Sequence, residues 1–554
     1  MAMREEESNN RMMVDARGRM MRIIFIIFCA CLIAALLGAS AMAQNVPAGT
    51  GNETPGDNQS NTGAAVTYIP GANGSVAGNL TPAPTAGAAN ASGSAMQGAI
   101  YHVSVDGTNA GSGGEDQPWG TIQHAVDTAG PGDTILVHEG NYTGDVEMVL
   151  SGEEGRSITL TGAPGEKVGI HGGIGLQEGA SYIVVRNMSL DNYSAWGITL
   201  YGGNHHVHLA NMSMTGGDAG IHMTVGSSGE DPAFGPVTDV TIENCTIRDV
   251  LYTAVDGTPG PCERIVFRGL EVSGSGLEES YGADGIAVER GQDILVEDCR
   301  IHDNGGDGID LNSRDTEGNV SNITVRNNEV YRNHYSGIKL WAGGLIENNV
   351  VWGQGEGPIA GGDYPCTMEI LNNSVAYNGY DPEFGTRGYA LTVGYTEAQN
   401  GTPVRLRLTN NIFAFNSRPS GEGGHTGIYL GPGVDLLEER DNVYYSRVDG
   451  EIFAQFLCNP DRDYDTCDIT RKEIQDGTWA RLTGQGEGDL TVDPQFVSGW
   501  PNVDLHLKPG SPAAGHGAYP EAENRSVTGE TGTPTMTTTE KPTGEETPDE
   551  DSMP

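Results

Sequence analysis

The chain has 554 residues, of which 74 are acidic and 30 are basic, so its formal net charge is −44. A balance this negative argues against a nucleic-acid-binding protein, because affinity for phosphate comes from Lys and Arg. Glycine is abundant, at 82 residues, and Leu-rich helical periodicity is scarce, which excludes a helical solenoid.

The first 43 residues have the pattern of an export signal peptide. Arg17, Arg19 and Arg22 precede the apolar run 23–38, and Ala41-Met42-Ala43 is a small-x-small cleavage site. The run is somewhat short for a membrane-spanning helix. We therefore expect cleavage after Ala43 and a secreted or cell-surface protein, with a membrane contact only if the segment is retained.

Two segments have too few apolar side chains to fold. Residues 44–98 are rich in Gly, Ala, Asn and Thr and predict a disordered linker, and residues 519–554 predict a disordered acidic tail rich in Thr and Pro. The linker contains five Asn-x-Ser/Thr sequons, which either mark a glycosylated spacer or arise by chance in Asn-rich sequence. They begin at Asn52, Asn58, Asn73, Asn79 and Asn90.

Ordered structure is predicted over residues 99–518. The segment 99–104 predicts a first strand, residues 121–129 a short amphipathic helix, and residues 134–137 a second strand. An amphipathic helix before the first repeat suits a solenoid, since its open end has to be capped.

From about residue 158 to 443 one pattern repeats every 21 to 38 residues, an asparagine or a substitute at the end of an apolar alternation. Asparagine tolerates the left-handed backbone of a sharp corner and can bond to the next coil. The pattern predicts a right-handed parallel β-helix. The repeated positions are Asn187, Asn211, Asn244, Gly269, Asp298, Asn327, Asn348, Asn372 and Asn410.

Three phrases of one shape lie within residues 281–341: 284–287 (Asp-Gly-Ile-Ala), 307–310 (Asp-Gly-Ile-Asp) and 336–339 (Ser-Gly-Ile-Lys). If they stack as neighbouring strands, equivalent residues lie about 4.8 Å apart. Side chains alternate between the two faces of a strand. Asp284, Asp307, Asp310 and Lys339 are then predicted to converge on an outer face.

These residues also have an ordinary structural interpretation. Asp284 and Asp307 precede Gly and could simply make turns, and Lys339 could be a solvated surface lysine. Asp310, however, lies mid-strand, where Asp is disfavoured. Three adjacent carboxylates repel unless a cation lies between them, and their hard oxygens suit Ca²⁺. We expect that cation to lower the pKa of Lys339 and make it a general base.

The order of these residues resembles the catalytic coils of family 9 polysaccharide lyases, the parallel β-helix pectate lyases. The resemblance covers roughly residues 99–518 and implies that Asp284, Asp307 and Asp310 bind Ca²⁺ while Lys339 is the Brønsted base. The family typically has two adjacent aspartates before the Gly, where this chain has Gly306 in the first position, so one calcium ligand is absent.

The resemblance implies a calcium-dependent lyase that cleaves a polyuronate by β-elimination. Arg290 or Arg314 could bind a neighbouring carboxylate, and Tyr335 or Trp341 could stack on a sugar ring, although each also suits ordinary surface packing. Two alternatives stay open: a non-catalytic cell-surface β-helix that binds glycans, and a uronate C5-epimerase. We expect a monomer whose partner is an acidic polysaccharide.

The cysteines divide into two groups. Cys458 and Cys467 flank a short acidic loop and are the best disulfide candidates in an exported protein. Cys245 and Cys299 hold the same repeat position two coils apart, too far to be bridged, and are expected to be buried thiols.

Overall fold

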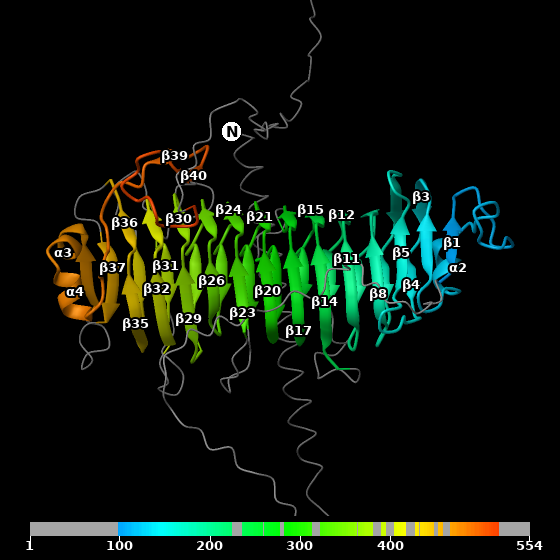
Figure 1. Cartoon of the computed structure of the whole chain (residues 1–554), viewed down its shortest axis with the longest axis horizontal. Helices are drawn as coiled ribbons and strands as arrows, with labels where there is room; N and C mark the ends of the chain where they lie inside the picture. The colour runs from blue at the N-terminus through cyan, green and yellow to red at the C-terminus, as the bar shows by residue number, and fades with distance from the viewer. Residues whose placement is uncertain are drawn as a thin grey trace, which may run out of the picture. The chain divides into compact units, whose positions relative to one another are not determined.

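The structure is a computed structural model that describes residues 98–223, 235–258, 260–276, 282–312, 322–362, 364–379, 389–394, 404–416, 427–431, 433–447, 452–457 and 466–519. These residues form a parallel β-helix, in which the chain visits three sheets in turn in each coil (Figure 1). Sheets 1, 2 and 3 are named in the order in which the chain visits them. No helix in the described ranges is long and apolar enough to cross a membrane.

Sheet 1 is parallel throughout. Its strands, in spatial order, are β1 (Ile100–Val103), β2 (Thr134–Val137), β5 (Ile158–Gly162), β8 (Ser181–Arg186), β11 (His205–Ala210), β14 (Val237–Glu243), β17 (Cys262–Arg268), β20 (Gly291–Glu297), β23 (Ile323–Arg326), β26 (Gly344–Glu347), β29 (Thr367–Leu371), β32 (Val404–Thr409) and β35 (Val434–Arg440).

Sheet 2 is also parallel and has shorter strands. They are β3 (Gly140–Thr143), β6 (Val168–His171), β9 (Ser189–Asp191), β12 (Ser213–Thr215), β15 (Thr246–Arg248), β18 (Glu271–Ser273), β21 (Arg300–His302), β24 (Glu329–Tyr331), β27 (Val350–Trp352), β30 (Ser374–Ala376), β33 (Ile412–Ala414) and β36 (Val443–Tyr445).

Sheet 3 carries the three phrases singled out above. Its strands are β4 (Val146–Met148), β7 (Ile174–Leu176), β10 (Trp196–Leu200), β13 (Ala219–Met223), β16 (Val255–Gly257), β19 (Ile286–Glu289), β22 (Ile309–Asn312), β25 (Ile338–Leu340), β28 (Ile359–Gly361), β31 (Leu391–Val393), β34 (Ile428–Leu430), β37 (Ile452–Leu457) and β38 (Thr466–Thr470). Only β38 pairs antiparallel to its neighbour.

The predicted asparagine column forms the corner between sheets 1 and 2. All nine predicted positions have positive φ, between 53° at Asn211 and 62° at Gly269, so the corner is left-handed as expected. In the later coils the buried ladder between coils is made one residue further on, by Asn328, Asn349, Asn373, Asn411 and Asn442, which are at most 1% exposed. Each of the first four donates its side-chain amide N–H to the next at 3.0 Å. The corner residues themselves also bond between coils at two places, where Asn211 donates to Asn187 at 3.0 Å and Asn410 donates to Asn372 at 2.8 Å. The expectation that one residue both makes the corner and bonds to the next coil holds there, and elsewhere the neighbouring asparagine makes the bond.

Inward side chains form apolar stacks from coil to coil. In sheet 3 one stack runs Ile286, Ile309, Ile338 and Ile359, all at 0% exposure. Burying a side chain of this size stabilises the fold by about 1.5–3 kcal/mol. Because these positions are fixed inward, the residues that alternate with them are fixed on the outer face.

Both ends of the β-helix are covered. The predicted N-terminal helix is α2 (Ile122–Val126), where the Thr121 side chain accepts a hydrogen bond from the His124 backbone N–H. The other end carries the helices α3 (Arg471–Gln475) and α4 (Thr478–Thr483), with Trp479 buried. The hairpin of β39 (Phe496–Ser498) and β40 (Asp504–Leu507) precedes a segment that returns to the coils.

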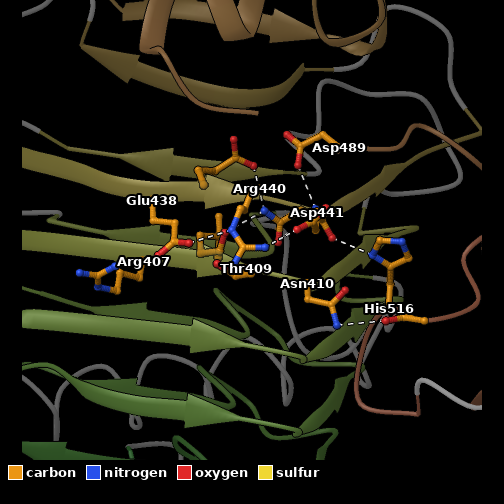
Figure 2. Close-up of polar contacts among 12 residues, drawn as sticks. Arg407, Thr409, Asn410, Glu438, Arg440, Asp441, Asp489 and His516 are labelled. Carbon is orange, nitrogen blue, oxygen red and sulfur yellow. Dashed lines mark hydrogen bonds and ion pairs between the residues drawn. The ribbon is translucent and has the colours of Figure 1, made fainter. Parts of the chain in front are cut away.

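That returning segment is bonded to the last Asn corners, as Figure 2 shows. His516 Nδ1 lies 2.7 Å from the carbonyl oxygen of Asp441, and Asn410 Nδ2 donates to the carbonyl of Gly515 at 3.1 Å. Asp489 Oδ1 accepts a hydrogen bond from the Asn442 backbone at 2.9 Å.

The cysteine predictions have different outcomes. Cys245 and Cys299 are free and buried, as expected, and burial raises the pKa of the two thiols to about 11 and about 12. Cys458 lies outside the described residues, and only the backbone of Cys467, in β38, is described. The Cys458–Cys467 disulfide therefore stays a prediction.

Candidate functional site

The three phrases stack in the predicted register on sheet 3. In the pairing of β19 with β22, Ala287 lies beside Asp310, and in the pairing of β22 with β25, Asp310 lies beside Lys339. Residues 284 and 307 precede these strands by two residues, in a second column beside the first. The predicted stacking of the three phrases is therefore confirmed, with Ala287, Asp310 and Lys339 in one outer column.

The lysine joins the two columns. Lys339 Nζ lies 2.8 Å from Asp307 Oδ2 and 2.7 Å from Asp310 Oδ2, in two ion pairs. The carboxylates are mostly covered, with residue exposures of 5% for Asp307 and 8% for Asp310, and the lysine is partly exposed. The ammonium also lies 5.1 Å from the ring centroid of Trp341, close enough for a cation–π contact.

Asp284 and Asp307 each use one oxygen to join neighbouring coils. Asp284 Oδ1 accepts a hydrogen bond from the Asp307 backbone at 2.7 Å, and Asp307 Oδ1 accepts one from the Ser336 backbone at 2.6 Å. Both aspartates therefore have a structural role between coils, and Asp307 combines it with the contact to Lys339.

Negative charge exceeds positive charge in this cluster. Burial, together with the charges of Asp307 and Asp310, raises the pKa of Asp284 to about 8. A carboxyl with this pKa is mostly protonated at neutral pH, which removes one negative charge from the face.

The pKa of Lys339 shifts against the expectation. Burial by itself would lower this pKa, but the charges of Asp307 and Asp310 and the hydrogen bonds to both raise it above its ordinary value. The expectation of a lowered pKa assumed a metal cation beside the lysine, whereas here two carboxylates contact it. In this arrangement Lys339 is an ammonium at neutral pH.

The carboxylates do not fit a calcium ion as they are placed. In the described part of the chain, no group of three or more His, Cys, Asp or Glu side chains is arranged to hold a metal. The Lys339 nitrogen lies between Asp307 and Asp310, where a cation would bind them both. Gly306 cannot simply be replaced by the family's aspartate, because a Cβ there would lie 2.4 Å from Asp284 Oδ1.

The four predicted substrate-binding residues differ in how close the structure places them to Lys339. Trp341 contacts Lys339, and Tyr335, which is partly exposed, packs edge-on against His334 with ring centroids 5.0 Å apart. Arg290 lies at the corner after β19 with φ 55°. Arg314 lies outside the described residues, so its role stays a prediction.

The sequence interpretation missed a second polar cluster in the same two columns of sheet 3. His222 of β13 pairs with Asp256 of β16, and His222 Nδ1 lies 3.0 Å from Asp256 Oδ2. Trp196 of β10 stacks on His222 with ring centroids 4.4 Å apart and is 36% exposed. The signal was present in the sequence, since the phrase 220–223 (Gly-Ile-His-Met) places His222 where the later phrases have Asp310 and Lys339.

Asp256 is held as a carboxylate. Burial raises its pKa, but the His222 side chain and the Thr258 hydroxyl and backbone N–H more than offset this, so the pKa lies below its ordinary value. Asp256 and Asp310 are two strands apart, with Ala287 between them. The outer face therefore carries two polar clusters separated by a small residue.

Two family profiles match most of the β-helix. Residues 101–260 match one described as "Pel9A-like, right handed beta helix region", and residues 260–431 match one described as "Right handed beta helix region". A protein of Bacillus subtilis (strain 168) with the name "Uncharacterized protein YwoF" is 22% identical over 348 residues, which are 51% of this chain and 74% of that protein.

Solved structures with a similar fold include three polysaccharide enzymes. Pectate lyase Pel9A is 15% identical, with 62% of this chain and 79% of that chain covered and a TM-score of 0.41. A rhamnogalacturonan lyase is 14% identical, with 70% and 99% covered and a TM-score of 0.41. The A-module of the Azotobacter vinelandii mannuronan C-5 epimerase AlgE4 is 15% identical, with 60% and 88% covered and a TM-score of 0.35.

The coil-by-coil pairing of the three sheets gives a parallel β-helix, and both profiles describe a right-handed one. The described part of the chain is a right-handed parallel β-helix, and residues 101–260 of it are similar to the Pel9A-like β-helix region.

Proposed function

We propose that this protein is a lyase that cleaves an acidic polysaccharide of the polyuronate type by β-elimination. One observation carries the proposal: Lys339 is held on the outer face of sheet 3 against Asp307 and Asp310, beside the ring of Trp341. A fixed, partly exposed amine next to an aromatic ring can both meet a sugar and exchange a proton with it.

In this reaction the neutral amine of Lys339 takes the C5 proton of a uronate residue. The C5–H electron pair forms the C4–C5 double bond, and the bond from C4 to the glycosidic oxygen breaks. The oxygen leaves with that electron pair and takes a proton from water. Because Asp307 and Asp310 hold Lys339 as an ammonium, the amine has to lose its proton first, and the proposal expects activity to rise at alkaline pH.

The neighbouring groups prepare the face for an anion. Protonated Asp284 reduces the negative charge that an arriving uronate carboxylate meets. Trp196, in the second polar cluster, offers a partly exposed ring on which a further sugar of the same polymer could pack. Together they suit a chain of sugars laid across the strands of sheet 3.

Calcium is retained as a separate proposal, and no step above depends on it. The three carboxylates have the hard oxygens that Ca²⁺ prefers, but a calcium ion could bind only if Lys339 gave up its ion pairs with Asp307 and Asp310. We also propose that residues 1–43 direct export and that the protein acts outside the cell as a monomer.

The decisive experiment is to incubate the purified protein with polygalacturonate, alginate and other polyuronates, with and without Ca²⁺, and follow the ultraviolet absorbance of unsaturated products. A lyase increases this absorbance. An epimerase instead incorporates deuterium at C5 in D₂O without forming a double bond, as NMR would detect. If neither change occurs but the polymer binds, the non-catalytic glycan-binding alternative replaces the lyase.

A further inference from the structure

A cavity of about 610 Å³ lies between the C-terminal hairpin and the ends of sheet 2, and none of its lining residues belongs to sheet 3, which carries Lys339. One wall comes from residues that follow β30, β33 and β36, and the other from the hairpin of β39 and β40. The lining residues are Tyr377, Phe415, Arg447, Asp493, Gln495, Phe496, Val497, Ser498, Gly499, Trp500 and Lys508.

The floor of this cavity is aromatic and rigid. Tyr377 and Phe415 stack nearly parallel, with ring centroids 5.0 Å apart and an interplanar angle of 8°. Phe496 packs against both, at 6.3 Å and 6.2 Å. All three are at most 7% exposed, and Gly499 lies so close to Tyr377 that a Cβ there would be 2.5 Å from the hydroxyl oxygen. The cavity is therefore preformed by packed rings.

Two cationic side chains, Arg447 and Lys508, line this cavity. Arg447 and Lys508 are exposed, and the guanidinium carbon of Arg447 lies 4.9 Å from the Phe415 ring centroid. Neither has an acidic partner within 4.0 Å among the described residues, although most arginines on sheet 1 have one, as Arg264, Arg268 and Arg326 do. Asp493 is the one carboxylate in the lining. The charged lining groups therefore sum to +1 in a chain whose net charge is −44.

We propose that this cavity binds an anionic sugar residue of an acidic polysaccharide, as a binding site separate from the Lys339 face. The planar guanidinium of Arg447 and the ammonium of Lys508 can bind the carboxylate. Val497 and Trp500, the exposed and partly exposed apolar residues of the lining, can contact the apolar face of the sugar, while the buried rings hold the wall in place. Asp493 and Gln495 can bond to hydroxyl groups. Such a site would keep the polymer attached whether or not the Lys339 face performs chemistry.

The test is calorimetric titration of trigalacturonate into the Lys339→Ala protein, which prevents turnover. Arg447→Gln combined with Lys508→Gln is compared with Lys167→Gln combined with Arg186→Gln, an equal loss of charge at exposed cations elsewhere. Because charged hydrogen bonds are strong, each lost cation is expected to weaken binding at the cavity about tenfold or more. The Lys167→Gln/Arg186→Gln control is expected to bind one more equivalent of trigalacturonate than the Arg447→Gln/Lys508→Gln variant.

Galactotriose, which has no carboxylate, is the ligand control and is expected to bind at least about tenfold more weakly than trigalacturonate. Lys508→Gln alone provides a second variant at an exposed side chain if the double variant does not fold. The proposal is overturned if the cavity variant and the charge control bind equal numbers of trigalacturonate molecules with equal affinity, or if galactotriose binds as tightly as the acidic sugar. Because these outcomes need no catalysis, they are independent of whether the lyase proposal holds.

Discussion

At the scale of single residues, variants of Lys339 distinguish a catalytic function from a function in glycan binding alone. Its raised pKa means that the neutral fraction increases about tenfold for each pH unit below that pKa. If Lys339 is the base, the rate of product formation increases with about this slope from pH 7 to pH 10. Lys339→Ala should abolish the reaction, and it should also lower stability, because Asp307 and Asp310 lose the cation that compensates them. Lys339→Arg keeps that positive charge but should be nearly as inactive, because guanidinium stays protonated.

Initial rates from ultraviolet absorbance, with circular dichroism as the folding control, would check this. Full activity in Lys339→Arg would contradict the assignment and leave the residue as a clamp for the substrate carboxylate.

The calcium question is also a question about one residue, Gly306. Restoring the family's aspartate with Gly306→Asp should not create a calcium site, because the new side chain would collide with Asp284 and with the backbone of Ala283. We expect lower thermal stability and no gain in calcium affinity, measured by calorimetry, with Asp310→Asn as the comparison. Tighter calcium binding by Gly306→Asp than by the wild type would contradict this expectation and show that the carboxylates rearrange around the ion. In that case a chelator should remove activity from the native protein.

At the scale of elements, the ladder of buried asparagines holds the coils in register. Asn349 is 0% exposed, donates to the Val325 carbonyl at 2.9 Å and accepts from the Asn328 backbone at 3.0 Å. Asn349→Ala leaves these groups buried without partners, which should lower the free energy of unfolding by about 3 kcal/mol. The adjacent Asn348 only needs its left-handed backbone, at φ 56°.

The matched control is therefore Asn348→Gly, since glycine adopts this backbone readily, and it should change stability by no more than about 0.5 kcal/mol. Urea denaturation followed by circular dichroism measures both. Equal losses in the two variants would show that the corner, rather than the ladder, fixes the register.

The same contrast shows what the sequence could and could not predict. Periodicity predicted the left-handed corners and the pairing of Asp310 with Lys339, because both follow from strict alternation along stacked strands. It could not predict the ion pairs of Lys339 with Asp307 and Asp310, since these depend on side-chain rotamers. Trp196 and His222 were missed because the cluster they form with Asp256 becomes visible only when three neighbouring coils are aligned.

At the scale of the whole molecule, charge should set how stability depends on pH. Glu297 is an example of a carboxylate paired with arginines. Burial raises the pKa of Glu297, but Arg326 and Arg268 more than offset this effect, so the pKa lies below its ordinary value. Such groups stabilise the fold above an unfolded-state pKa of about 4, and this contribution is lost as the pH falls further. Asp489 is the opposite case, because burial and the charge of Glu439 raise its pKa to about 9.

A carboxyl of the second kind binds a proton in the folded state but not in the unfolded state between about pH 4 and pH 9, so its effect on stability becomes more unfavourable as the pH rises through that window. Self-repulsion of a chain with net charge −44 adds to the loss. We expect the melting temperature to be highest near pH 5 and to fall toward pH 9.

Asp489→Asn, which mimics the protonated acid, should have the same melting temperature as the wild type at pH 5 and a higher one at pH 9. A melting temperature that rises from pH 5 to pH 9, or an Asp489→Asn difference that does not depend on pH, would show that Asp489 is ionised in the folded protein and that the paired carboxylates dominate.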